Sequence, residues 1–286
     1  MNLLEVRGLT KQYAGFRLDA VSFDLPPGYI MGFIGRNGAG KTTTIKAMLN
    51  LVHRDAGEVT ILGRDFFAHE LELKASLGLA FGGVDYYPGV PLHRITDAYA
   101  RFFAAWDWPA YRGYLARFEL DDTKKVSQLS AGMKVKYALA LALSHHARLL
   151  VLDEPTSGLD PISRDDLLDL FREIIEDGER SILFSTQITS DLDKCADYIT
   201  YIRDGRIVAS DTAEAFLDSY RLVKGSAAQL AEVLPVLIGH KSTDLGFTGL
   251  IASRDEAGAA GCQLSRPDIE AVMIYCERAG REEEEK

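Results

Sequence analysis

A glycine-rich segment beginning at Gly35 constrains this chain more than any other part of its sequence. Residues 35–42 read Gly-Arg-Asn-Gly-Ala-Gly-Lys-Thr, which fits the pattern G-x-x-x-x-G-K-[ST]. The apolar run Tyr29–Ile34 precedes it and is typical of a strand buried on both faces. A helix is expected to begin at Lys41 and to end at about Val52. A strand, a glycine loop and a helix in this order predict one βα unit of an α/β fold.

The pattern predicts a phosphate-binding loop, because glycines let the backbone approach phosphate oxygens closely and point its N–H groups at them. The helix that follows presents its positive N-terminal end to the same oxygens. We expect Lys41 to reach the β- and γ-phosphates of ATP, and the hydroxyl of Thr42 to bind Mg²⁺. The expected nucleotide-binding residues of the loop are Gly35, Asn37, Gly38, Ala39, Gly40, Lys41, Thr42 and Thr43.

Two adjacent acids supply the second half of the predicted site. The apolar run Leu149–Leu152 predicts a buried strand, and Asp153 and Glu154 follow it directly. Ligands of open α/β sheets bind at the carboxyl ends of the strands, which is where these acids fall. We expect Asp153 to hold Mg²⁺ and Glu154 to act as the general base on an attacking water. The alternative is that the two acids merely end the strand before Pro155.

Charge and composition narrow the class of protein. The formal net charge is −10 and the pI is about 5.1, whereas nucleic-acid binders usually carry a basic surface, so no nucleic-acid partner is expected. Apolar stretches such as Ala138–Leu143 are far shorter than the roughly 20 residues of a spanning helix. The N-terminus lacks the basic start and apolar core of a signal peptide, so the chain is expected on the cytoplasmic side.

Hydrophobic periodicity predicts how the rest of the chain is organised. Alternating segments at residues 3–8 and 16–25 predict N-terminal strands. Residues 87–126 are rich in aromatic side chains and predict a mostly helical insertion. Further along, the expected elements are helices at 131–145, 161–176 and 189–196, strands at 149–152 and 181–185, and a hairpin at 198–210.

After about Tyr220 the pattern restarts and predicts a small α/β domain over residues 221–280. The final residues 281–286 contain four consecutive glutamates and predict a disordered acidic end. Within the small domain the expected elements are strands at 221–224 and 245–252 and helices at 227–234 and 267–279.

The segment at 129–133, Leu-Ser-Ala-Gly-Met, separates this chain from other nucleotide-binding families. It resembles the ABC signature, usually Leu-Ser-Gly-Gly-Gln, and it stands just upstream of the acidic strand as that family requires. Ser130 and Gly132 match the signature, whereas Ala131 and Met133 depart from it. A lone Ser-x-Gly before a helix also reads as a helix N-cap, so its position in the chain carries the resemblance.

Two further motifs strengthen the resemblance. Ser-Gly-Leu-Asp at 157–160 matches the family's D-loop, and Tyr13 stands where the family has an aromatic ring that stacks on adenine. The motifs occur in the family's order over about residues 2–220. The resemblance implies a P-loop NTPase of the ABC type over residues 1–220. That fold has an antiparallel β subdomain and a helical subdomain at about 87–130, and here a small C-terminal α/β extension follows.

In the ABC family two subunits pack head to tail, with ATP between the Gly35–Thr43 loop of one and the Ser130–Gly132 segment of the other. The resemblance therefore implies ATP and Mg²⁺ as cofactors and a second ABC ATPase subunit, identical or different, as a partner. A membrane-spanning permease on a separate chain is the other implied partner, and the helical insertion is the part expected to dock on it. The implied location is peripheral, on the cytoplasmic face of the cell membrane.

Two positions depart from the family pattern. Aligned on Leu77-Gly78, the usual Gln at the end of the strand after the first helix is Gly82, followed by Gly83. Glycine offers no side chain to Mg²⁺ or water, so the nucleotide would be coupled to the insertion differently. The alternative is a plain flexible turn.

The second departure is Gln187, where the family has a His that contacts the γ-phosphate. Gln can donate a hydrogen bond but cannot carry a positive charge. This predicts weak hydrolysis with ATP binding retained, whether the Gln is a natural variant or a replacement that traps the ATP-bound state. The expected catalytic residues are Glu154, Gln187 and Lys41.

Met133–Lys136 and Ile188–Leu192 look like the corresponding segments of bacterial ABC-2 exporter subunits, which include bacitracin-type and cytolytic-peptide exporters. Export of peptides or antimicrobial compounds is therefore the leading expectation. Two alternatives stay open. One is an ABC ATPase without transport, as in translation factors or DNA-repair machines, which usually carry two such domains or a long coiled-coil insertion. The other is a nucleotide-sensing regulatory subunit.

Overall fold

The computed structural model describes residues 2–81 and 87–284, without the side chains of residues 280–284. The chain forms two compact units. The first comprises residues 1–187 and 200–208, and the second comprises residues 188–199 and 209–286. Within the described residues, the helices are all too short or too polar to cross a bilayer.

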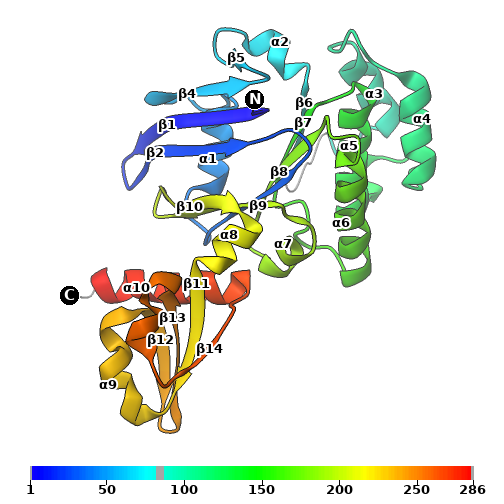
Figure 1. The fold of residues 1–286 in the computed structure, drawn as a ribbon. Helices are drawn as coiled ribbons and strands as arrows, with labels where there is room; N and C mark the ends of the chain where they lie inside the picture. The colour runs from blue at the N-terminus through cyan, green and yellow to red at the C-terminus, as the bar shows by residue number, and fades with distance from the viewer. Residues whose placement is uncertain (1, 82–86, 285–286) are drawn as a thin grey trace. The chain divides into compact units, whose positions relative to one another are not determined.

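A six-stranded sheet organises the first unit (Figure 1). Its order is β10-β9-β3-β8-β7-β6, and β3, β8, β7 and β6 are parallel. Every residue of β3, β7 and β8 is buried, as expected for parallel strands covered on both faces. The strands are β3 (Ile30–Ile34), β6 (Leu77–Phe81), β7 (Leu149–Asp153), β8 (Ser181–Thr186), β9 (Tyr198–Arg203) and β10 (Arg206–Thr212).

Helix α1 (Lys41–Met48) follows β3 through the glycine-rich loop, as the sequence predicts, but it ends four residues before Val52. Asn50 adopts a left-handed conformation (φ 55°), and the N–H groups of Leu51 and Val52 both donate to the Lys46 carbonyl (2.8 and 3.3 Å). Asparagine tolerates the left-handed region better than most residues, so it ends the helix here.

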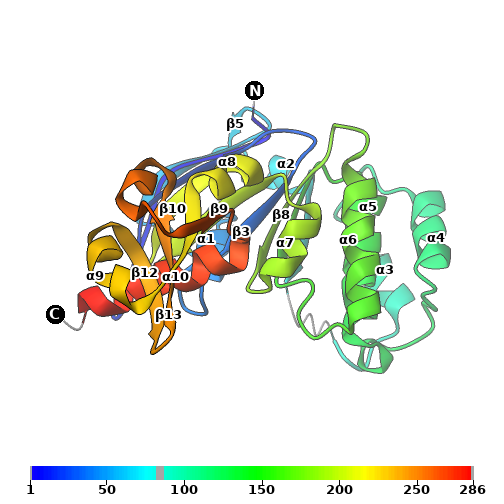
Figure 2. The same ribbon diagram turned by 60° about the horizontal axis from the view of Figure 1, so that its bottom comes forward.

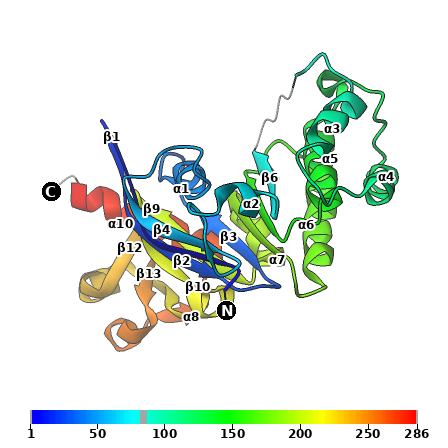
Figure 3. The same cartoon turned by 90° about the horizontal axis from the view of Figure 1, so that it is seen from above.

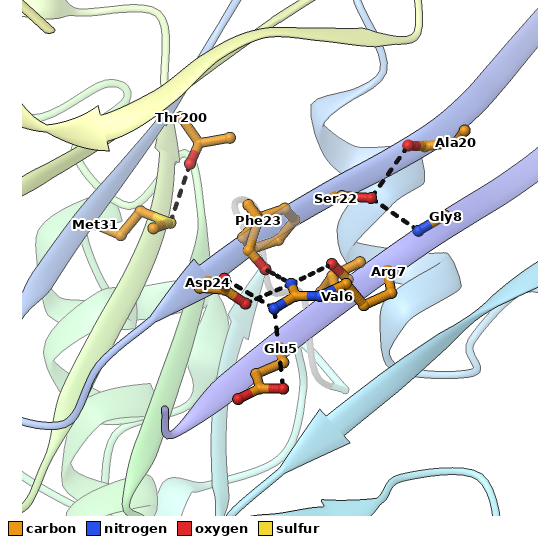
Figure 4. A network of polar contacts seen from close by, with 10 residues as sticks. All are labelled: Glu5, Val6, Arg7, Gly8, Ala20, Ser22, Phe23, Asp24, Met31 and Thr200. Carbon is orange, nitrogen blue, oxygen red and sulfur yellow. Dashed lines mark hydrogen bonds and ion pairs between the residues drawn. The ribbon is translucent and has the colours of Figure 1, made fainter. Parts of the chain in front are cut away.

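The N-terminal antiparallel subdomain is a separate four-stranded sheet of order β2-β1-β4-β5. The strands are β1 (Leu4–Tyr13), β2 (Phe16–Leu25), β4 (Ala56–Ile61) and β5 (Arg64–Asp65). Figure 4 shows how Arg7 of β1 joins the first two strands: its guanidinium donates to Asp24 of β2 (2.9 Å) and lies 3.9 Å from Glu5. Both partners are about half exposed, so this pair contributes little stability. In the β1–β2 ladder, Glu5 and Asp24 are direct partners.

The predicted helical insertion contains α3 (Leu92–Ala100) and α4 (Trp108–Arg117), which lie beside α5 (Ala131–Ser144) and α6 (Pro161–Ile175) in Figure 3. Its aromatic residues form a continuous cluster of ring contacts made by Tyr99, Phe103, Trp106, Trp108, Tyr111 and His145. His145 stacks on Phe103 with ring centroids 3.8 Å apart. Burial lowers the pKa of His145 to about 4, so this imidazole is neutral at pH 7.

The second unit is a four-stranded antiparallel sheet of order β12-β13-β11-β14 with helices around it (Figure 2). One face packs on a core of Val223, Val233, Phe247, Ile251 and Ala259. The elements of the unit are α7 (Thr189–Cys195), α8 (Ala213–Asp218), β11 (Tyr220–Gly225), α9 (Leu230–Val233), β12 (Leu237–Thr243), β13 (Gly246–Ala252), β14 (Gln263–Ser265) and α10 (Ile269–Glu284).

This unit departs from the sequence-based expectation at its start and at its end. The compact units do not divide at residue 220, where the domain boundary was expected, because α7 packs on α10 and the Ala213 N–H donates to the Asp197 carbonyl. Helix α10 continues to Glu284, four residues into the segment expected to be disordered. Glutamate is a good helix former, which favours this continuation despite the repeated charge.

Candidate nucleotide-binding site

The described residues line an open pocket of about 610 Å³ at the loop between β3 and α1, which is larger than a pocket of about 430 Å³ in the second unit. Its lining residues come from the end of β1, the start of β2, the glycine-rich loop, the start of α1 and the residue after β7. They include Tyr13, Gly15, Phe16, Arg36, Asn37, Gly38, Gly40, Lys41, Thr42, Thr43 and Glu154. Most of the residues predicted from the loop pattern thus line one hollow.

The loop needs glycine at two points where the chain approaches its neighbours closely. A Cβ on Gly35 would lie 2.3 Å from the Ile202 carbonyl oxygen, which no real side chain tolerates. Gly40, the residue before α1, has φ 114° and a Cβ there would lie 2.9 Å from the Phe16 ring. These contacts press the loop against β9 and β2, so its N–H groups are held in place before a phosphate arrives.

Lys41 is buried, with 6% of its side chain exposed. Its ammonium donates to the carbonyls of Gly35 (2.7 Å) and Arg36 (3.4 Å), and lies 3.6 Å from Oε1 of Glu154. A buried ammonium needs such partners to offset its lost hydration. The arrangement keeps the charge at the mouth of the loop, where phosphate oxygens can take over from the carbonyls.

The two residues expected to bind Mg²⁺ contact each other. The Thr42 hydroxyl donates to Oδ2 of Asp153 (2.8 Å), and the Ser185 hydroxyl donates to Oδ1 of the same carboxylate. Adjacent ligands of an octahedral ion with bonds of about 2.1 Å lie about 3.0 Å apart, so this oxygen pair matches the spacing that Mg²⁺ requires. Both oxygens are of the hard type that Mg²⁺ prefers. The residues present therefore fit the ion.

Glu154 stands in an unusual backbone conformation at the end of β7. Its φ of 53° is left-handed, and its N–H donates to both the carbonyl and the hydroxyl of Ser185 (3.1 Å each). For a residue with a side chain this conformation costs on the order of 1 kcal/mol or more. Such strain persists where the surroundings enforce it, and it gathers at functional sites.

The Glu154 carboxylate is set up to accept a proton. Burial raises the pKa of Glu154 and nearby Asp153 adds to the rise, whereas the charge of Lys41 and the Gln187 N–H oppose it. Among the described residues, Oε2 of Glu154 is buried without a hydrogen-bond partner. A carboxylate with a raised pKa and one unused oxygen is suited to take a proton from a water molecule.

Gln187 follows β8 directly, and its backbone N–H hydrogen-bonds the Glu154 carboxylate. Its side chain is exposed. The structure therefore brings the Gln187 backbone next to Glu154, while the expected contact of its side chain with a γ-phosphate stays a prediction. Gly82 and Gly83 lie outside the described residues.

The signature segment does not join this pocket within one chain. Ser130 is exposed and caps α5 by accepting from the Met133 N–H (3.2 Å), and Gly132 packs near Leu159. Neither is among the described residues that line the larger pocket. A nucleotide role for Ser130 and Gly132 therefore remains a prediction that involves a second subunit.

Tyr13 lies on the rim of the larger pocket. Its ring is 41% exposed, and the Lys11 ammonium lies 5.5 Å from its centroid. An exposed aromatic face beside a phosphate loop is compatible with base stacking, which stays a prediction for this residue.

Sequence reasoning missed Ser185, which holds both Asp153 and the Glu154 backbone. Its signal was available, because Ser185 is a polar residue at the carboxyl end of a buried strand adjacent to β7. In the sheet, Asp153 and Ser185 are direct partners. Phe16 and Arg36 also line the larger pocket and were not predicted.

Comparisons with known proteins also point to an ATP-binding protein. The sequence profile of the ABC transporter family matches residues 18–157. The chain is 32% identical to the bacitracin transport ATP-binding protein of Bacillus licheniformis over 209 residues, which cover 72% of this chain and 68% of that protein. It is 30% identical to a daunorubicin resistance ATP-binding protein of Streptomyces coeruleorubidus, with 95% of both chains covered.

Solved structures give the same result. An ATP binding subunit of an ABC transporter superposes with a TM-score of 0.67 at 26% identity, covering 74% of this chain and 91% of that one.

Proposed function

The chain belongs to the ABC transporter family as an ATP-binding protein with the ABC ATPase fold, and we propose that it hydrolyses ATP to power an exporter. One observation carries this proposal. Lys41 and Thr42 at the start of α1 meet Asp153 and Glu154 at the end of β7, with ion-pair and hydrogen-bond distances of 2.8 to 3.6 Å.

Each side chain has a distinct task in this proposal. The loop N–H groups and Lys41 hold the β- and γ-phosphates, and Thr42 and Asp153 hold Mg²⁺. When bound, Mg²⁺ neutralises charge that develops on the phosphates. Glu154 positions the attacking water and takes its proton, while the N–H of Gln187 fixes the carboxylate. Positioning and charge neutralisation supply most of the catalysis in phosphoryl transfer, so these groups suffice.

The chain needs two partners in this proposal. A second ABC ATPase subunit places its signature segment over the bound ATP, which agrees with the exposure of Ser130 at the start of α5. A membrane-spanning permease on another chain receives the force, and the chain lies on the cytoplasmic face of the membrane. The names of the relatives, which concern bacitracin transport and daunorubicin resistance, support a peptide or antimicrobial compound as the cargo.

Gln187 favours a second candidate function, a nucleotide sensor that binds ATP and turns it over slowly. In the proposed transporter, replacing Gln187 by His restores a side chain that can carry positive charge near the γ-phosphate. We expect Gln187→His to raise the ATPase rate of the complete transporter complex. Equal rates for the two proteins would remove the hypothesis that Gln187 limits turnover.

The decisive experiment measures ATP binding and ATPase rate of the chain reconstituted with its permease in a membrane. Coupled turnover that rises with cargo supports the transporter. Tight ATP binding without turnover in the complete complex identifies the sensor. If neither the chain alone nor the reconstituted complex has measurable affinity for Mg-ATP, both the transporter and the sensor proposals are contradicted.

A further inference from the structure

The smaller pocket, of about 430 Å³, belongs entirely to the second unit and shares no lining residue with the nucleotide site. It opens at the β12–β13 hairpin. Lys224 of β11, Lys241 of β12 and Thr248 of β13 line it, together with Tyr275 of α10 and the hairpin residues Thr243 and Leu245–Phe247. Lysine, hydroxyl and aromatic groups thus gather at one end of a small sheet.

The strand register explains why two lysines meet here. Thr248 of the central strand pairs with Lys224 on one side and with Lys241 on the other. Residues in one cross-strand row project to the same face, and two strand spacings separate the lysine backbones by about 10 Å. Val223, one position earlier, projects to the opposite face and belongs to the apolar core.

Helix α10 walls the pocket from the same side as the lysines. A Cβ on Gly239 of β12 would lie 2.2 Å from the Tyr275 carbonyl oxygen, so α10 rests directly on that strand. Two positions after Gly239, Lys241 projects to the same face and lines the pocket together with Tyr275. Burial raises the pKa of Tyr275, and the charge of Arg278, one turn further along α10, opposes that rise, but Arg278 is not among the described residues that line the pocket.

The described side chains offer the two lysines no neutralising partner. Neither ammonium has a hydrogen-bond or ion-pair partner among the residues whose side chains the structure describes, 2–81 and 87–279. Asp244, the nearest acid along the hairpin, makes no ion pair with either of them within that set. The two lysines project to one face about two strand spacings apart, so an anion between them would be attracted to both. The concentration of positive charge is notable in a chain whose net charge is −10.

An exposed apolar residue stands beside this positive pocket. Asp244 and Leu245 form the two-residue tip between Thr243 and Gly246, and Leu245 is 94% exposed. An exposed leucine at a hairpin tip, with lysines beside it, is the combination of side chains found in elements that bind a membrane surface. Basic side chains bind the phosphate layer while an apolar side chain enters the boundary with the acyl chains.

We propose that this pocket and hairpin tip bind an anionic phospholipid bilayer, with Lys224 and Lys241 on headgroup phosphates and Leu245 at the acyl boundary. The site gives the second unit a function that needs neither ATP nor the permease. It deepens the proposed peripheral location, but its test is independent of ATP turnover.

The test mixes the full-length chain with vesicles of phosphatidylcholine alone or of phosphatidylcholine with phosphatidylglycerol, and measures co-sedimentation at low salt. Binding is expected only to the vesicles that contain phosphatidylglycerol. The double variant Lys224→Gln with Lys241→Gln should lower the partition coefficient about 25-fold, since each lysine near an anionic surface contributes about fivefold. Leu245→Ser should lower the partition coefficient about tenfold, which corresponds to roughly half of the free energy of transferring a leucine side chain out of water.

A matched control separates this site from general charge. Lys124→Gln with Arg254→Gln removes two exposed positive charges elsewhere in the chain and changes the net charge equally. This control should bind the anionic vesicles within about twofold of the unaltered chain. ATP binding and the thermal unfolding curve should be the same in all variants, and the unfolding curve checks that the second unit is folded.

Three results would overturn the proposal. One is equal vesicle binding by the lysine double variant and the control. Another is saturable binding of inorganic phosphate to the pocket without vesicle binding, which would assign it to a soluble phosphate compound. The third is a dimer in solution that the lysine double variant abolishes in the absence of vesicles, which would make an acidic segment of a second copy the occupant. Failure of ATP hydrolysis would leave the lipid proposal standing, and loss of lipid binding would leave the ATPase proposal standing.

Discussion

The chain holds its lysines in two contrasting ways at its two pockets. Lys41 is buried, bonded to two loop carbonyls and 3.6 Å from the Glu154 carboxylate. Lys224 and Lys241 share a strand row and have no partner among the residues with described side chains. The first charge is held at a fixed point for a ligand of defined geometry. The second pair offers charge over a broader surface, which suits a ligand without fixed orientation.

If both proposals hold, exposure and partnering distinguish the lysine that binds a nucleotide from the lysines that bind a membrane. A buried, compensated lysine acts at short range in a low dielectric, where a displacement of its partners has a large effect. Exposed lysines act through a field that salt screens over about 10 Å at 0.1 M ionic strength. The predictions below test whether the two sites follow these different rules.

The largest expected effect comes from removing the acid that faces Lys41. Glu154→Gln keeps the size of the side chain but removes the base, so the ATPase rate should fall by about 10² to 10⁴. ATP binding should be retained, and an ATP-bound dimer should accumulate on size-exclusion chromatography. If this variant hydrolyses ATP normally, Glu154 is not the base.

Removal of the compensated lysine itself should come next. Lys41→Ala deletes charge-assisted hydrogen bonds to the phosphates, so the Kd for ATP should rise about a hundredfold. Lys46→Ala, an exposed lysine on the same helix, is the matched control. Similar affinities for the two variants in isothermal titration calorimetry would contradict the assignment of Lys41.

The pH dependence should differ between the sites. Because burial raises the pKa of Glu154 above that of an ordinary glutamate, the base takes up its proton at a higher pH. The base must be deprotonated, so turnover is full above that raised pKa and is lost as pH falls through it. The pH profile of kcat/KM should therefore show an acid limb at a pH above 4.5. Vesicle binding should not follow that limb.

The smallest expected difference is in salt dependence. Raising ionic strength from about 0.1 to 1 M shortens the screening length from about 10 to 3 Å. Vesicle binding should fall steeply over this range, while ATP affinity should change far less because the Lys41 contacts are buried. Equal slopes in the two titrations would show that the sites do not differ as proposed.

Local patterns made the nucleotide site predictable. The residues from Gly35 to Thr43 are consecutive, and Asp153 and Glu154 stand at the end of an apolar strand, so predicting their roles needs no knowledge of distant packing. Ser185 was missed because its importance arises from pairing with Asp153 across two parallel strands. Sequence gives no direct measure of that register.

The second unit was harder to predict for the same reason. β12 reads Leu-Ile-Gly-His-Lys-Ser-Thr, which lacks the alternation of a half-buried strand, and β14 has only three residues. The helix expected at 227–234 is divided into a 3₁₀ turn, α9 and a second 3₁₀ turn that contains Pro235. Lys224 and Lys241 are distant in sequence and become neighbours only through β13. The alignment of the two lysines across β11, β13 and β12 depends on the register of strands that pair in the tertiary structure.

Because Glu154 has a left-handed backbone conformation, the residue that suits activity at this position differs from the residue that would give the most stable fold. Glycine adopts that conformation without the cost that a side chain brings, so Glu154→Gly should stabilise the fold by about 0.5 to 1 kcal/mol relative to Glu154→Gln. Thermal unfolding of the two variants measures this difference. A lineage that no longer needed turnover could therefore lose its base through a mutation that makes the protein more robust, and selection for transport alone would hold the glutamate in place.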